Sequence, residues 1–278
     1  MVCSGRFVSA SQQWMSVNMD SINISNMARL STLADTELLD TIQCFHQRTK
    51  YLLDKRIANC GKFPVPLASL ESLEYTDNEI SPFFHQSIKI SSKHKVDFKR
   101  AGSNMFFSKE KMSFDLLQSL LCESFSADEQ GKRPYPSGGA LYPAETIAII
   151  MGDRMTDSPQ SGIYHFRPSL NTLQLLRHVS TEDLYDSIFI EDTKQLGTPC
   201  VAFVYVINLP KATVKYSYRG YRNAITEVGS MYQQADLVAS SLGIKNRLSS
   251  SFSDDQLARF LELDSQVYLP ITLQYFGF

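Results

Sequence analysis

The chain has 278 residues, of which 43% are hydrophobic and 20% are charged, as is typical of a globular protein with a full core. Its formal net charge of -2 at pH 7 excludes a general binder of nucleic acid or of anionic membranes. No apolar run approaches the roughly 20 residues that span a bilayer, and the polar N-terminus lacks the apolar segment of a secretion signal, so we expect a cytoplasmic protein.

The spacing of cysteines and histidines matches no metal or disulfide motif. The cysteines never form a CxxC pair, which is typical of a reducing compartment: Cys3, Cys44, Cys60, Cys122 and Cys200. None of the five histidines shows HExxH or another metal-ligand spacing. We therefore expect no metal site, and the spacing assembles no Ser/His/Asp or Cys/His triad.

Residues 1–95 predict an N-terminal arm with a helical lead-in rather than a complete domain. The first 30 residues are polar, whereas residues 32–57 place apolar side chains at near-helical spacing. Prolines punctuate the stretch that follows and predict an extended, loop-like course. We expect this arm to be a docking segment for partner subunits.

Residues 96–278 predict one α+β domain in which helices cover a mixed sheet. Apolar spacing and turn residues give these elements in chain order: helix 108–125, loop 133–143, strand 145–151, hairpin strands 162–166 and 173–176, a short helix from Ser180 or Thr181 to Ile188, strand 201–207, helix 224–242, helix 253–263 and strand 270–276. The strand at 201–207 is apolar throughout, as expected of a central strand covered on both faces. Gly243 fits a C-terminal stop, and Ser253 with Gln256 has the spacing of a capping box.

The loop from Arg133 to Pro143, with the sequence RPYPSGGALYP, is the first segment that can carry chemistry. Gly138 and Gly139 lack a Cβ, so the backbone can approach a flat ligand closely, while the prolines restrict the loop. Ser137 and backbone N–H groups can bond a ring or a phosphate, and Arg133 adds charge. The alternative is a rigid turn between a helix and a strand. The segment has no Walker A, GxGxxG or GxSxG pattern.

The segment from Lys215 to Arg222, KYSYRGYR, gathers three tyrosines, two arginines and one lysine. It is either a solvated edge with amphipathic tips or a catalytic segment in which a tyrosine beside a cation acts as acid or base. A free tyrosine has a pKa of about 10, so action near pH 7 requires about 4 kcal/mol of phenolate stabilisation. A nearby ammonium group can supply it. Lys215 and Tyr216 would point to opposite faces of a strand, and they can cooperate only if the backbone turns there.

Two basic clusters could hold a phosphate. Lys245 and Arg247 follow the long predicted helix, where the alternative is a simple interaction with its negative end. Arg100 and Ser103 belong to a cluster ahead of the first helix of the domain. Basic residues with a hydroxyl group suit phosphate binding, although a solvated charge run is the commoner meaning.

The motifs together resemble a known family. The RPYPSGGALYP loop, followed by Glu145 and an apolar strand, and the segment GIYHFRP at 162–168 resemble the SagB-type dehydrogenases of the FMN-dependent nitroreductase-like superfamily. KYSYRGYR at 215–222, EVGSMYQ at 227–233 and GIKNR at 243–247 resemble the microcin-type azoline oxidases (dehydrogenases) of thiazole/oxazole-modified peptide synthetases. These motifs occur in one order from about residue 95 to the C-terminus.

The resemblance implies a nitroreductase-like α+β fold, a homodimer with FMN at the subunit interface, and oxidation of thiazoline and oxazoline rings. An ATP-dependent cyclodehydratase makes such rings from Cys and Ser/Thr of a precursor peptide. That peptide, the cyclodehydratase and a scaffold subunit are therefore the implied partners. The catalytic Lys-Tyr pair of the microcin-type enzymes matches Lys215 and Tyr216.

The same resemblance assigns residues to FMN. In the flavin-holding loop these are Arg133, Pro136, Ser137, Gly138, Gly139, Ala140, Leu141 and Tyr142. For the phosphate they are Lys245 and Arg247, with Arg100 and Ser103 in a degenerate form of the Arg/Ser-rich start that is typical of nitroreductases. Our hypothesis is that Tyr216 removes a ring proton, that Lys215 stabilises its phenolate, and that dioxygen reoxidises FMN.

Two other functions fit parts of the sequence. One is a general nitro- or quinone reductase that uses NAD(P)H, although such an enzyme needs no Lys-Tyr base. The other is a flavin-free subunit that only assembles the synthetase, although the completeness of the flavin-type loop argues against it.

Overall fold

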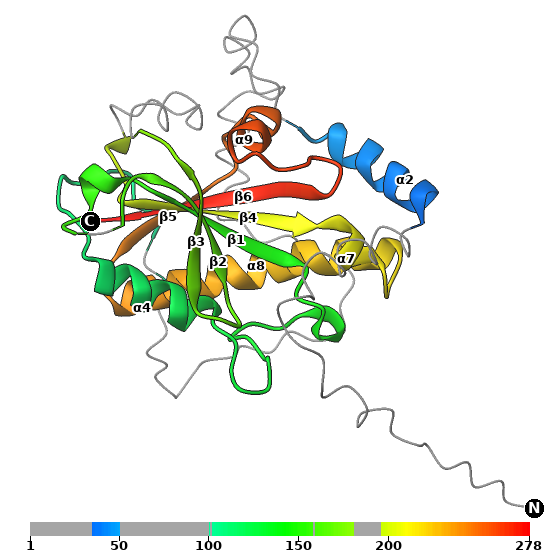
Figure 1. Ribbon diagram of the computed structural model, residues 1–278, viewed down its shortest axis with the longest axis horizontal. Coiled ribbons are helices and arrows are strands. Elements are labelled where there is room, and N and C mark those ends of the chain that lie inside the picture. The colour runs from blue at the N-terminus through cyan, green and yellow to red at the C-terminus, as the bar shows by residue number, and fades with distance from the viewer. Residues whose placement is uncertain (1–34, 51–99, 101, 158, 181–195) are drawn as a thin grey trace, which may run out of the picture.

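The computed structural model describes residues 35–50, 100, 102–157, 159–180 and 196–278, which form one sheet with helices packed against it (Figure 1). The helices are α2 (Thr36–Gln47), α4 (Phe114–Phe125), α7 (Leu209–Thr213), α8 (Tyr218–Ser241) and α9 (Asp254–Phe260), with short 3-10 turns η2 (Gly138–Ala140) and η3 (Gly152–Arg154). The strands are β1 (Ala144–Ile150), β2 (Gly162–Arg167), β3 (Thr172–His178), β4 (Val201–Asn208), β5 (Lys245–Ser249) and β6 (Tyr268–Gly277). The predicted helix that ends at Ile188 and most of the predicted arm lie outside the described residues.

The strands form a sheet in the order β3-β2-β1-β4-β6-β5, and every neighbouring pair in the described part of the chain is antiparallel. The prediction of a mixed sheet was therefore wrong. Helix α8 makes the kind of long connection, from β4 to β5, that can join parallel neighbours. However, β6 inserts between these two strands and runs antiparallel to both. The predicted hairpin is confirmed as β2 and β3.

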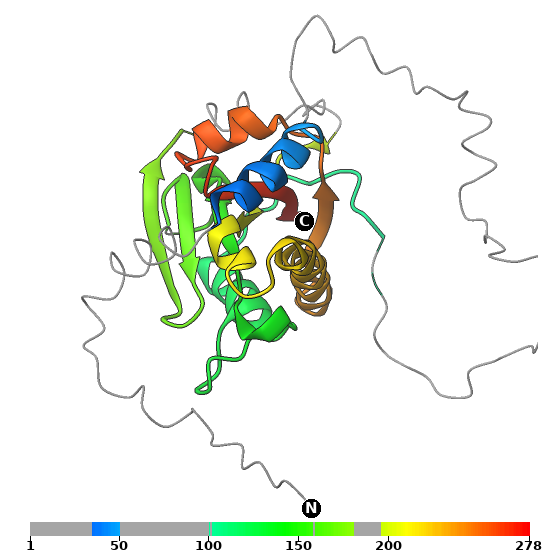
Figure 2. The ribbon, with the colours of Figure 1, turned by 90° about the vertical axis from the view of Figure 1, so that its right-hand side faces the viewer.

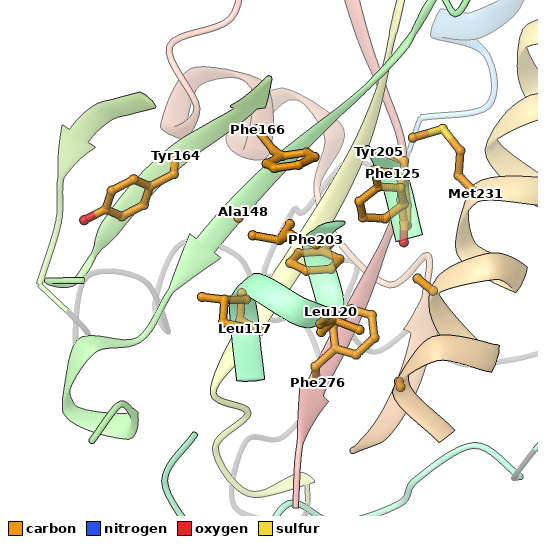
Figure 3. Packing of buried hydrophobic residues seen from close by; sticks show 14 of the residues in the cluster. Leu117, Leu120, Phe125, Ala148, Tyr164, Phe166, Phe203, Tyr205, Met231 and Phe276 are labelled. Atoms are coloured by element: carbon orange, nitrogen blue, oxygen red, sulfur yellow. The ribbon is translucent and has the colours of Figure 1, made fainter. Parts of the chain in front are cut away.

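Strand β4 lies inside the sheet and is buried along its whole length, as its apolar sequence predicted. Phe203 and Tyr205 face the core shared with α4 and α8, whereas Ala202 and Val204 face the core shared with α9. Figure 2 shows α4 and α8 on one side of the sheet and α9 on the other. In Figure 3 the ring of Phe125 lies against Phe203 and Tyr205, with ring centroids 5.7 and 6.1 Å apart. This packing holds α4 against one face of the sheet.

Helix α8 spans 24 residues and runs along the sheet from α7 to β5 (Figure 1). It begins at Tyr218, earlier than the predicted residue 224, because its first turn packs tightly on α7. A Cβ at Gly220 would overlap the carbonyl oxygen of Ala212, so only glycine allows this approach. The helix ends before Gly243, as predicted, and the φ of 71° at that glycine is the left-handed conformation of a helix stop.

Helix α4 begins at Phe114 rather than at the predicted residue 108. The buried guanidinium group of Arg154 donates hydrogen bonds to the backbone carbonyl oxygens of residues 108–110. These oxygens therefore bond to Arg154 and do not accept the N–H groups of a first helical turn. Ser113 caps the helix instead, because its Oγ accepts a first-turn N–H at 3.2 Å.

Helix α9 begins directly after Ser253, where the capping box predicted it. The Ser253 side chain makes no capping hydrogen bond, however, so the proposed chemistry of the cap was wrong. The helix ends at Phe260, before the predicted residue 263, because Glu262 takes a left-handed conformation with a φ of 55°.

Helix α2 is the described part of the predicted arm. It starts after Asp35, whose carboxylate accepts two N–H groups of the first turn at 3.1 and 3.3 Å. It ends at Gln47, so the predicted continuation of the helix through residues 48–50 was wrong, and residues 51–57 lie outside the described part of the chain. Thr49 bonds back to the carbonyl oxygen of His46 through its N–H and its hydroxyl group, which terminates the helix. The apolar face of α2 packs on α7 and β6.

His46 gives the protein a predictable response to acid. Burial, with Lys50 nearby, lowers the pKa of His46 from 6.5 to about 4, and its Nδ1 lies 3.1 Å from Tyr221 Oη. Because the unfolded chain takes up this proton before the folded chain does, the contribution to stability is complete above pH 6.5 and is lost as the pH falls toward about 4. We expect the wild type to lose on the order of 3 kcal/mol more unfolding free energy across this window than His46→Gln. Urea unfolding at several pH values checks this, and equal pH slopes in the two proteins would contradict it.

Two classes of feature are missing from the part of the chain that the structure covers. No group of three or more His, Cys, Asp or Glu side chains there is arranged to hold a metal ion. No helix there is long and apolar enough to cross a membrane.

Candidate active site

The predicted glycine loop packs against α8 and is tied to it by hydrogen bonds. Ser137 Oγ donates to the buried carboxylate of Glu227 in α8 and accepts the N–H of Tyr142 at 2.9 Å. The second carboxylate oxygen of Glu227 accepts the N–H of Ala144 at 3.2 Å. Both ends of the glycine segment are therefore fixed to one helix.

The loop holds an unusual run of left-handed backbone. The φ angles are 66° at Gly139, 56° at Ala140 and 46° at Tyr142. Glycine adopts this conformation freely, whereas alanine and tyrosine do so only where the surroundings hold them there. The predicted cofactor residues of this segment are exposed or half-buried: Pro136, Ser137, Gly138, Gly139, Ala140, Leu141 and Tyr142. A ligand can therefore reach this face of the loop.

Lys215 and Tyr216 lie in a turn between α7 and α8, so the backbone reverses where cooperation of the pair requires it. The next residue, Ser217, has φ 52° and ψ -137°, outside the regions that most residues occupy. The Nζ of Lys215 lies 5.4 Å from the centre of the Tyr216 ring, within the range of a cation–π contact. The turn thus brings the ammonium group and the phenol together.

Both side chains point at the glycine loop. A Cβ built on Gly139 would overlap the hydroxyl oxygen of Tyr216 and would lie 2.8 Å from Lys215 Nζ. A Cβ on Gly138 would lie 3.1 Å from Asn223 Nδ2 in α8. The two segments that the sequence marked as candidates therefore form one site, and glycine at residue 139 leaves the space into which the phenol and ammonium groups project.

Arg133 supports the loop from within. Its Nη1 donates to Tyr135 Oη at 2.9 Å, and its guanidinium carbon lies 4.7 Å from the centre of the Tyr142 ring. Burial raises the pKa of Tyr135, so this hydroxyl group stays neutral. These contacts give Arg133 a role in shaping the loop, and its direct contact with a cofactor stays a prediction.

The predicted phosphate residues gather at the other end of α8. Arg100 Nη2 donates to Ser103 Oγ at 3.2 Å, and Arg100 Nε lies 3.3 Å from Asp236 Oδ2. Arg247 Nη1 lies 3.0 Å from the sulfur of Met105. The segment before α4 and the segment after α8 therefore meet in one cluster, as a shared phosphate site requires.

Lys245 and Arg247 lie in strand β5, at the edge of the sheet, rather than in a loop at the helix end. Lys245 is exposed, Asn246 is buried and Arg247 is half-buried. Because side chains alternate along a strand, the two cations project to the same face. The strand therefore places both cations where they can contact the same anion.

A buried polar network fixes the position of this cluster. Asn246 Nδ2 donates to Asp236 Oδ1 at 2.6 Å, and Asn246 Oδ1 accepts from Gln274 Nε2 at 2.9 Å. Tyr205 Oη in turn donates to Gln274 Oε1 at 2.7 Å. Connected hydrogen bonds in the interior specify one arrangement of strands, so the network links the centre of the sheet to the cluster around Arg100.

The two clusters lie far apart within one chain. The Lys-Tyr turn directly precedes Tyr218, the first residue of α8, whereas Arg100 contacts Asp236 near its other end. At 1.5 Å per helical residue, these two positions are about 27 Å apart along the axis. The structure therefore unites the loop with the Lys-Tyr pair, and Arg100 with Arg247, but it does not unite the two clusters with each other.

Glu227 and Asp236, the two acidic residues that anchor these clusters, are not among the residues predicted from the sequence to act in the site. Both lie on the buried face of α8, beside Val228 and Ala235. Acidic residues are rarely buried unless they are paired, so their place within the apolar stripe of the helix was the available signal.

Comparison with known proteins agrees with this architecture. Residues 103–278 match the model of the nitroreductase family. The microcin B17-processing protein McbC of Escherichia coli is 37% identical over 258 residues, which cover 91% of this chain and 94% of McbC.

Solved structures show the same relationship. A chain of the E. coli microcin synthetase McbBCD complex with truncated pro-MccB17 bound superposes with a TM-score of 0.83 and 36% identity, covering 91% of this chain and 97% of that chain. A nitroreductase-type protein of Ralstonia eutropha superposes with a TM-score of 0.53 at 19% identity over 64% of this chain and 78% of that chain, which supports the fold alone. With its family match extending from residue 103 to the C-terminus, this chain belongs to the nitroreductase family, as its motifs predicted.

Proposed function

We propose that this chain is the FMN-dependent azoline oxidase of a peptide-modifying synthetase. It would convert thiazoline and oxazoline rings of a ribosomally made precursor peptide into thiazoles and oxazoles. The observation that carries the proposal is the convergence of Lys215 and Tyr216 on Gly139 at the open face of the glycine loop. Similarity to McbC, a microcin B17-processing protein, supports a peptide substrate and partner subunits.

The residues present fit FMN. The exposed backbone at Gly138 and Gly139 offers a surface for a flat ring, and a Cβ at residue 139 would fill the space in front of the phenol. Arg100, Lys245 and Arg247 supply the cations that a phosphate group requires. When bound, FMN supplies the hydride acceptor of the reaction.

The Lys-Tyr pair supplies the base. An azoline ring becomes an azole by losing one hydride and one proton, and Tyr216 takes the proton on its phenolate oxygen. The Lys215 ammonium group stabilises that phenolate through its charge, because the turn places it beside the ring. Tyr216 is half-buried, so its oxygen can meet the substrate and still release the proton to water.

The separation of the two clusters supports a site shared by two copies of the chain. About 27 Å along α8 is too far for one FMN to place its ring at the Lys-Tyr turn and its phosphate at Arg100 of the same copy. A two-fold dimer can bring the Arg100 cluster of one copy to the glycine loop of the other. Tyr218 and Ile225, which are 53% and 41% exposed beside the Lys-Tyr turn, give the apolar surface that such an interface covers. The other partners would be the ATP-dependent cyclodehydratase and the scaffold subunit, with residues 1–95 as their docking segment.

The test starts with the visible absorption spectrum of the purified protein, the mass of the released cofactor and the mass of the protein in solution. We expect bound FMN and a dimer. The protein is then mixed with a peptide that carries azoline rings, and each converted ring should lose two hydrogen atoms in the mass spectrum. Oxidation of NAD(P)H without a peptide would favour a general reductase, whereas a colourless protein that takes up no added FMN would favour a scaffold subunit.

A further inference from the structure

Glu227 occupies a position that the proposed reaction does not use. It lies on the inner face of α8, and its side chain is buried, with only 3% of the residue exposed. Its two carboxylate oxygens have different partners: one accepts the hydroxyl hydrogen of Ser137, and the other accepts the N–H of Ala144 at 3.2 Å. These partners lie at the two ends of the glycine loop.

The arrangement requires two acceptors at residue 227. The Ser137 oxygen already accepts the N–H of Tyr142 at 2.9 Å, so its own hydrogen is directed at Glu227. The N–H of Ala144 is a second donor. A carboxylate can accept both hydrogens, whereas an amide offers one oxygen and would turn its NH₂ group toward a donor.

The segment between these ends is the one that a flat ligand would meet. Ala140 and Tyr142 hold left-handed backbone, which side chains other than glycine rarely adopt without external support. The bond from the Tyr142 N–H to Ser137, and from Ser137 to Glu227, supplies that support. The loop's shape therefore depends on a helix residue 90 positions away in the sequence.

We propose that Glu227 is a positioning residue whose carboxylate holds the 137–144 loop in the shape that receives the flavin ring. The part that concerns the flavin rests on the proposed function. In this arrangement the Ser137 hydroxyl group supports the loop itself, and the loop backbone contacts the cofactor.

The surroundings of Glu227 make the hold sensitive to pH. Burial raises the pKa of this carboxyl group, while the hydrogen bonds from Ser137 and Ala144 and the charges of Arg133 and Lys211 act in the opposite direction. Protonation would remove one of the two acceptors. FMN affinity should therefore fall as the pH drops through the raised pKa of Glu227, and a variant with glutamine should lack this dependence.

The experiment compares Glu227→Gln, Glu227→Asp and Ser137→Ala with the full-length wild type. Thr272→Val is the matched control, because it removes one buried hydrogen bond, from Thr272 Oγ1 to a backbone oxygen at 2.9 Å, outside the loop. Two readouts are taken: hydrogen exchange of the Tyr142 and Ala144 amides without flavin, and FMN affinity from a fluorescence titration at several pH values.

We expect Glu227→Gln to weaken FMN binding by about tenfold or more, which is the scale of one lost hydrogen bond to a charged group. Both amides should exchange faster, and the pH dependence should disappear. Glu227→Asp should recover part of the affinity, because it keeps both acceptors on a shorter chain. Ser137→Ala should affect the Tyr142 amide, and Thr272→Val should leave both readouts at the wild-type level.

The proposal is overturned if Glu227→Gln matches the wild type in amide exchange and affinity, or if Thr272→Val weakens FMN binding equally. A wild type that binds no FMN would defeat the proposed function and the flavin part of this inference. Faster amide exchange in Glu227→Gln would, even then, support the hold on the loop, so the two failures can be told apart.

Discussion

Tyr216→Phe should lower the rate of azole formation by about 100- to 10,000-fold, the usual contribution of a general base, while FMN content stays at the wild-type level. The substitution removes only the oxygen that takes the proton and leaves the ring that faces Lys215 Nζ at 5.4 Å. The rate is measured as the loss of hydrogen from an azoline peptide followed by mass spectrometry, and FMN content by absorption.

A neighbouring tyrosine provides the control for this prediction. Tyr218 is 53% exposed at the start of α8, so Tyr218→Phe removes a hydroxyl group from the same segment and keeps the ring that the proposed interface covers. We expect it to keep most of the activity. A Tyr216→Phe enzyme with the wild-type rate and full FMN content would show that the base lies elsewhere.

Lys215 allows the pair to be tested as a unit. If Lys215 acts only by stabilising the Tyr216 phenolate, then Lys215→Met should be slow, and combining it with Tyr216→Phe should be no slower than Tyr216→Phe alone. Additive losses would mean that the ammonium group has a separate role.

Gly139→Ala should cost both FMN affinity and azole formation by roughly tenfold or more, the equivalent of about 1.4 kcal/mol. The new Cβ would overlap the Tyr216 hydroxyl oxygen and come within 2.8 Å of Lys215 Nζ, so both proposed catalytic groups would be displaced from the face of the loop. Alanine would also have to adopt a φ of 66°, which costs on the order of 1 kcal/mol. Flavin titration and peptide turnover give the two effects.

Gly131 separates the collision from the backbone strain. Its φ is 78°, and a Cβ there would meet no atom within 4 Å, so Gly131→Ala imposes the strain without the collision. We expect Gly131→Ala to lower the melting temperature with little change in FMN affinity. If both alanine variants lose FMN equally, the space at Gly139 is not what matters.

Several elements of this fold were predicted correctly because apolar spacing and turn residues act within a short stretch of the chain. The apolar run at 201–207 became a central strand, and the hairpin of β2 and β3 formed around its predicted turn. Two helix starts were predicted wrongly because they depend on residues outside the helix itself. Arg154 occupies the carbonyl oxygens that would have begun helix α4 earlier, and the close packing of Gly220 on Ala212 starts α8 before its apolar stripe.

The antiparallel sheet is a further case of this kind. The order of helices and strands along the chain is compatible with a mixed sheet, because helix α8 connects two strands that run in the same direction. Only the insertion of β6 between β4 and β5 makes every described pair antiparallel. That insertion depends on strand pairing across the whole domain, which local spacing does not encode.

The sequence by itself determined the family and the segments proposed to carry the chemistry: the glycine loop, the Lys-Tyr pair and the basic clusters can be recognised as motifs because each is contiguous. Tertiary structure alone decided how they meet. The turn after α7 places Lys215 and Tyr216 at Gly139, Glu227 ties the loop to α8, and the length of that helix keeps the Arg100 cluster away from both. These relations join residues that are far apart along the chain, and only packing fixes the distances between them.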